Sequence, residues 1–173
     1  MRLLRSALVF ALIAAAVWPE LARYRAERRL RTAADALRLF VAERASVANA
    51  YEAFGRVAEV ALSTAPALPG DPRPFFLAGS AQLAAGDADR ALALYREALA
   101  RGERAEMDLN LGRVSDLLGN AATAKAAYIR GAWVSPALLD SLPPETARSI
   151  RDAVTHLEAE LAAGRLAAPP PLR

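Results

Sequence analysis

The residues that could carry chemistry are few and lie far apart in the sequence. The single histidine, His156, lies near Glu158 and Glu160. A serine nucleophile needs a histidine base with an orienting acid, and a metal cluster needs several ligands. We therefore interpret His156 as a surface or cap residue. Asp87 and Asp89 suggest a calcium loop, but the other ligands of such a loop are missing, so we interpret both as turn and N-cap residues.

Other kinds of reactive site are also absent from the sequence. There is no cysteine, which excludes disulfides, thiolate metal sites and cysteine nucleophiles. The spacing of Gly112, Gly119 and Gly131 does not match a glycine-rich phosphate loop, and helix packing accounts for it. We predict no catalytic residue, no metal, no cofactor and no enzymatic activity.

The composition favours a chain that is almost entirely helical. Apolar residues make up 54% of the sequence and aromatic residues only 6%, and alanine and leucine, both strong helix formers, supply most of the apolar share. Apolar residues recur every three or four positions from Glu20 to about Ser63, which indicates one helical stripe with a break at Ser46 to Asn49. Prolines and glycines from Pro66 to Pro74 form a linker that ends this helical region.

An internal repeat follows the linker. Four residues recur at an offset of 33 positions, and the pairs are Gly79 and Gly112, Gly86 and Gly119, Ala91 and Ala124, and Tyr95 and Tyr128.

This pattern resembles the tetratricopeptide repeat family, whose unit is a helix–turn–helix of about 34 residues. The first repeat runs from about Pro72 to Arg104 and the second from about Ala105 to Leu138. The resemblance implies that each helix pair approaches closely at Gly79 and Ala91, or at Gly112 and Ala124, with a tyrosine between the helices. The sequence departs from the family pattern where Asp108 replaces an aromatic residue, Gly131 an alanine and Glu103 a proline.

The resemblance also implies a concave groove that is lined by the first helix of each repeat and binds other proteins. By position, its lining would comprise Arg73, Phe76, Ser80, Leu83, Glu106, Leu109, Asn110, Arg113 and Asp116. Some relatives hold a peptide carboxylate with asparagine and basic side chains, and Asn110 and Arg113 are suitable residue types for this. A mixed, shallow protein-binding face and a merely solvated surface are the alternatives.

The N-terminal segment has the layout of an export signal. Arg2 and Arg5 precede an uncharged, mostly apolar run from Ser6 to Trp18. It could be an uncleaved membrane anchor, a cleaved signal peptide or a buried helix. We expect an anchor in the bacterial inner membrane, with the body facing the periplasm; the arginines after the anchor favour the cytoplasmic side.

Charge is distributed unevenly along the chain. Residues 1–31 hold seven arginines and two glutamates, a net +5, and the remaining 15 basic and 17 acidic residues give −2. A basic flank beside an apolar segment indicates contact with lipid headgroups. The body lacks the clustered positive face of a nucleic-acid binder, so we expect no nucleic-acid partner.

Together these features predict an all-α, short tetratricopeptide-like solenoid with an N-terminal transmembrane or signal helix and a C-terminal capping helix. We expect a non-enzymatic scaffold or assembly factor for an envelope complex, such as one that matures a periplasmic enzyme; an integral structural subunit of a membrane complex is the alternative. The predicted parts are an anchor (1–22), a basic juxtamembrane helix with a degenerate hairpin (23–65), a linker (66–74), two repeats (72–138), a capping helix (139–166) and a disordered proline-rich tail (167–173).

Overall fold

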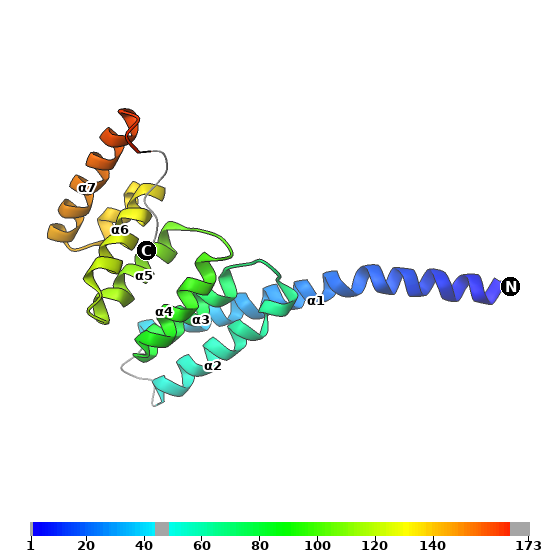
Figure 1. Ribbon diagram of the computed structural model, residues 1–173. Coiled ribbons are helices and arrows are strands. Elements are labelled where there is room, and N and C mark those ends of the chain that lie inside the picture. The colour runs from blue at the N-terminus through cyan, green and yellow to red at the C-terminus, as the bar shows by residue number, and fades with distance from the viewer. Residues whose placement is uncertain (1, 44–48, 167–173) are drawn as a thin grey trace.

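The computed structural model describes residues 2–43 and 49–166, and the regular elements in these ranges are helices without any strand. The predicted all-α class is therefore confirmed. Neighbouring helices along the chain pack against each other (Figure 1). Except for Asn49, the predicted break at Ser46 to Asn49 lies outside the described residues, as does the tail 167–173. The elements are α1 (Arg2–Ala42), α2 (Ala50–Ser63), the 3-10 helix η1 (Ala65–Ala67), α3 (Arg73–Ala85), α4 (Ala88–Leu99), α5 (Ala105–Leu117), α6 (Ala121–Val134), the 3-10 helix η2 (Pro136–Ser141) and α7 (Pro144–Ala162).

Helix α1 is a single helix of 41 residues that runs through Pro19, and its N-terminal part projects away from the other helices (Figure 1). The expected assignment to the bacterial inner membrane is wrong, because no helix in the described ranges is both long and apolar enough to cross a bilayer. The physical reason is the placement of charge. Arg5 and Glu20 bound an uncharged run of only 14 residues, whereas a span needs about 20.

The second half of α1 packs against α2 and α3 through one buried stripe. Ala26, Leu30, Ala33 and Leu37 recur at steps of four, three and four residues and are all buried, as expected for one face of a helix. Burying a leucine side chain contributes roughly 1.5–3 kcal/mol. This stripe, more than intrinsic helix propensity, therefore holds α1 on the other helices.

Two turns of the same design join α3 to α4 and α5 to α6. Gly86 and Gly119 adopt positive φ values of 89° and 73°, which glycine reaches without steric cost. The next residue caps the following helix: Asp87 accepts a hydrogen bond from the Arg90 backbone N–H, and Asn120 accepts one from that of Thr123. The predicted N-cap role of Asp87 is confirmed.

Glycines allow the two helices of each of these pairs to approach closely. A Cβ atom added at Gly79 would lie 2.9 Å from Cε1 of Tyr95 and 3.4 Å from the carbonyl oxygen of Ala91. One added at Gly112 would overlap the ring of Tyr128. The two pairs thus share one packing contact, a tyrosine ring laid on a glycine.

The C-terminal elements close the far end of the row of helices. Ala147 and Ile150 of α7 pack with residues of α6 and η2 in a separate apolar cluster. The helix stops before Gly164, whose φ of 68° suits the position after a C-cap. His156 lies on the exposed surface of α7.

Candidate protein-binding groove

Helices α1, α3 and α5 contact each other in series, while α2, α4 and α6 follow them as second members of the pairs. The face formed by α1, α3 and α5 carries two hollows. We call this face the inner groove. Six of the nine side chains that the repeat pattern predicts for binding line these hollows.

The first hollow lies between α1 and α3 and has a volume of about 420 Å³. Three predicted residues, Arg73, Phe76 and Ser80, line it. The Phe76 ring packs on Tyr95 with the ring centroids 5.8 Å apart. The Ser80 hydroxyl donates to the Phe76 carbonyl and accepts from the Tyr95 hydroxyl at 3.2 Å. Its lining is thus an apolar, preformed surface with charged residues around it: Glu27, Arg31, Arg38, Arg73 and Arg104.

Arg73 is held in place by acidic neighbours. Its Nη2 lies 2.8 Å from Oε1 of Glu27 and 2.6 Å from Oδ2 of Asp71. Hydrogen bonds to Asp71 and then Glu27 raise the pKa of Arg73. Burial alone would raise the pKa of Asp71, but the hydrogen bonds and charge of Arg73 lower it overall. Arg73 therefore ties the linker to α1, and its charge is largely neutralised before any partner arrives.

The second hollow, of about 570 Å³, lies between α3, α5 and the η2–α7 connection. Three more of the predicted residues, Leu83, Arg113 and Asp116, line it. Nη2 of Arg113 donates to the Ser141 carbonyl at 3.2 Å. The Tyr128 hydroxyl donates to Oδ2 of Asp116 at 2.8 Å, and burial followed by this hydrogen bond raises the pKa of Tyr128. The polar groups are thus fixed around an apolar contact area.

The nine predicted groove residues are only partly brought together. Three line the first hollow and three the second. Glu106, Leu109 and Asn110 line neither hollow: Glu106 is exposed, Leu109 packs partly buried on a neighbouring cluster, and Oδ1 of Asn110 accepts from Nη1 of Arg113 at 3.5 Å. The Asn110–Arg113 pair therefore lies at the edge of the second hollow.

The sequence pattern missed Leu117, which lines the second hollow and is 69% exposed. Its neighbour Leu118 is also exposed. The signal that could have identified it is the pair of leucines directly before the Gly119 turn. A helix end that faces only water has no use for two large apolar side chains, so such a pair indicates a binding surface. The wall formed by Ser141, Leu142, Pro143 and Thr146 was missed too, since it depends on how η2 folds back.

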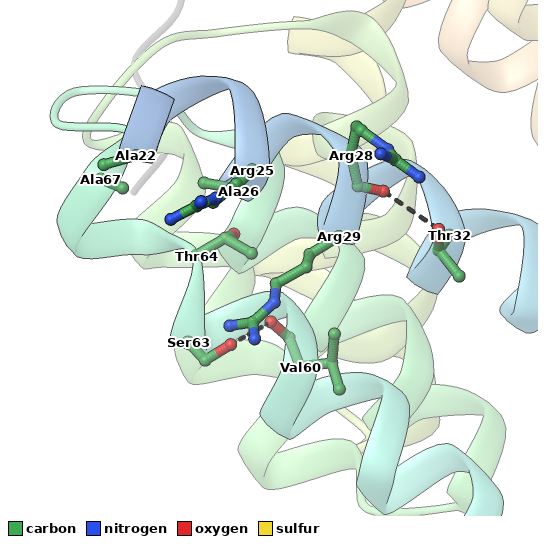
Figure 2. A pocket seen from close by; sticks show the side chains of 10 residues that line it. All are labelled: Ala22, Arg25, Ala26, Arg28, Arg29, Thr32, Val60, Ser63, Thr64 and Ala67. Atoms are coloured by element: carbon green, nitrogen blue, oxygen red, sulfur yellow. Dashed lines mark hydrogen bonds between the residues drawn. The ribbon is translucent and has the colours of Figure 1, made fainter. Parts of the chain in front are cut away.

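A third hollow, of about 610 Å³, lies on the other flank of α1, against α2 and η1 (Figure 2). We call it the basic trough. From sequence, the arginines within residues 23–31 were interpreted as a basic flank in contact with lipid headgroups. The structure instead places some of these arginines over a concavity lined by Ala22, Arg25, Ala26, Arg28, Arg29, Thr32, Val60, Ser63, Thr64 and Ala67.

Asp108 is the most perturbed acid of the described residues. It is 0% exposed, and neither carboxyl oxygen has a hydrogen-bond partner among the described residues. Burial, together with the nearby Glu103 charge and against the attraction of Arg130, raises its pKa to about 7. A Cβ added at Gly131 would lie 3.0 Å from the Asp108 Cβ. Asp108 and Gly131, two of the three departures from the repeat pattern, therefore face each other.

The described ranges hold no group of three or more histidine, cysteine, aspartate or glutamate residues suited to a metal ion. Asp108 lines none of the three hollows, so its carboxyl group is not accessible to a ligand there.

In the comparisons with known proteins, no family model, curated protein or solved structure matches the chain.

Proposed function

We propose that the protein is a non-enzymatic, tetratricopeptide-like scaffold whose inner groove binds a segment of a partner protein. The observation that carries this proposal is the inner groove itself. It combines apolar side chains that line the hollows, the partly buried Phe76 beside α1 and the exposed Leu117 beside η2, with polar groups already fixed by hydrogen bonds. Such a combination is typical of peptide and protein binding sites.

The repeat supports the solenoid part of the proposal. The pairs α3/α4 and α5/α6 share the glycine turn, the capping residue and the tyrosine-on-glycine contact at matching positions. Solenoids of this kind need about three units for a continuous core. The α1/α2 hairpin supplies a unit before the repeats, and α7 covers the last apolar face.

The second hollow is the centre of the proposed contact. Leu83 and Leu117 offer apolar surface, while Arg113 and Asp116 of α5 add one positive and one negative charge to the lining. Binding energy concentrates where an apolar anchor is surrounded by polar groups that exclude water. A partner segment with an apolar side chain flanked by polar residues fits this arrangement.

The experiment is capture of partners from the native cell extract by the full chain, quantified by mass spectrometry. The test variant changes Arg113 and Leu117 to alanine. The matched control changes Arg151 and Leu161, the same residue types on the exposed surface of α7. We expect a protein bound by wild type and control to be reduced at least fivefold with the groove variant, a loss of about 1 kcal/mol.

Equal capture of every bound protein by the groove variant would contradict the proposal, provided that circular dichroism shows both variants folded. Loss of captured proteins with the α7 control variant alone would indicate that partners bind the C-terminal helix instead.

A further inference from the structure

We propose that the basic trough is a second binding site and takes an acidic segment of a protein, with two carboxylates spaced to meet Arg25 and Arg29. The site lies on the flank of α1 opposite the first hollow and does not depend on the inner groove. It was not assigned by the repeat resemblance, which concerns α3 and α5.

The first support is the absence of counter-ions. Among the residues that the structure describes, no carboxylate forms an ion pair with Arg25, Arg28 or Arg29. The nearest acid in the sequence, Glu27, is bound to Arg73 on the other flank of α1. Three cations within five positions repel one another at low salt, so an anionic ligand would relieve this repulsion.

The second support is the state of the hydroxyl groups. Ser63 Oγ donates to the Val60 carbonyl at 2.7 Å, and Thr64 Oγ1 donates to that of Ala61 at 2.6 Å. Thr32 likewise donates to the Arg28 carbonyl (Figure 2). These hydroxyl hydrogens are already used, so the guanidinium groups are the donors that remain for a ligand. A guanidinium matches a carboxylate with two parallel hydrogen bonds.

The third support is the shape and placement of the charges. Figure 2 shows Arg25 and Arg29 extending over the trough, whereas Arg28 points to a different side. The charges do not converge on one point, which disfavours a single small anion. Four residues along a helix span about 6 Å. Carboxylates at i and i+4 of a helix, or at i and i+2 of an extended chain, have about the same spacing.

The lining selects a polypeptide among polyanions. The rest of the lining includes Ala22 and Ala26 of α1, Val60 of α2 and Ala67 of η1, which are small or apolar. They suit the methylene and methyl groups of a peptide that carries glutamates. A hollow between two helices offers little contact to a flat lipid surface, and it lacks aromatic rings on which nucleic-acid bases could stack.

The test measures binding of a fluorescein-labelled, alanine-based peptide with glutamates at i, i+4 and i+8 to the full chain, by fluorescence anisotropy at about 50 mM salt. A peptide with glutamine at those places is the matched ligand control. The test variant is Arg25→Gln with Arg29→Gln. The control variant is Arg90→Gln with Arg96→Gln, which removes the same charge from exposed positions on α4.

We expect the glutamate peptide to bind the wild type and the control variant with equal affinity. Its affinity for the trough variant should be lower by about tenfold or more. Binding to all three proteins should weaken when the salt concentration is raised to about 200 mM. No binding to wild type, equal binding of the glutamine peptide or equal loss in both variants would overturn the proposal. So would tighter binding of phosphatidylglycerol vesicles or a single-stranded oligonucleotide through Arg25 and Arg29. None of these results bears on the inner groove.

Discussion

Burial of Asp108 makes the stability of the folded protein fall as pH rises. The folded state raises the pKa of this carboxyl from its ordinary value of 3.8 to about 7. The neutral acid is therefore favoured in the folded protein, while the unfolded chain releases the proton from about pH 4 upward. Between these values the folded state binds more protons than the unfolded state, so stability falls as pH rises. Below pH 4 this contribution is fully present, and above about pH 7 it is lost.

The size of the effect follows from the difference between the two pKa values. Each pKa unit corresponds to about 1.4 kcal/mol, so the shift corresponds to roughly 4 kcal/mol at most. The raised pKa already includes the attraction of Arg130. Relaxation of the residues around Asp108 would reduce the energy further. We expect a measured loss of about 2–4 kcal/mol between pH 4 and pH 7 from this residue.

The assay is urea unfolding at several pH values from 4 to 8, monitored by circular dichroism, for wild type and the Asp108→Asn variant. Asparagine has nearly the same shape and does not titrate, so the difference between the two proteins isolates this carboxyl from all other titrating groups. The stability of wild type relative to the variant should fall by about 2–4 kcal/mol across this range. Asp152→Asn, on the exposed surface of α7, is the control and should follow wild type. Parallel curves for wild type and Asp108→Asn would refute the reasoning.

Three further changes test the packing. Gly112→Ala should lower the free energy of unfolding by about 1–3 kcal/mol because its Cβ would overlap the Tyr128 ring; an unchanged urea midpoint would contradict the close contact. Gly55→Ala should instead stabilise by about 0.5–1 kcal/mol, since an added Cβ at this position in α2 meets nothing within 4 Å, and a loss of stability in thermal melts would show a contact there. Asp87→Ala should cost about 1 kcal/mol through loss of the cap on α4, measured by urea unfolding; the Asp87→Asn variant should retain most of the stability, and equal losses would argue against capping.

The repeat made part of the fold predictable from sequence. Gly86 and Gly119 mark helix ends because a positive φ favours glycine, and the structure places a turn at each. The stripe from Leu30 to Leu37 likewise predicted the buried face of α1. Such signals are local: each depends on the backbone geometry or periodicity of a single element.

The features that depend on how distant elements meet could not be predicted in this way. Arg73 was expected to face a partner, yet Glu27, 46 positions away in the sequence, binds it. The basic trough required α2 to lie beside the arginines of α1, and composition alone made those arginines resemble a membrane flank. The membrane prediction was wrong because it counted residues on both sides of Arg5 and Glu20 as one span. The charges of these two residues limit the uncharged run to the segment between them.

The central claim is that partner proteins bind the inner groove, and site-specific photo-crosslinking tests it most directly. The photoreactive residue p-benzoylphenylalanine would replace Leu117 in the second hollow or, as a control, Ala93 on the exposed surface of α4. Both full-length proteins would be illuminated in the native extract, and the adducts identified by mass spectrometry. We predict a specific protein adduct from position 117 that is absent from position 93. Adducts from position 93 with none from position 117 would contradict the account.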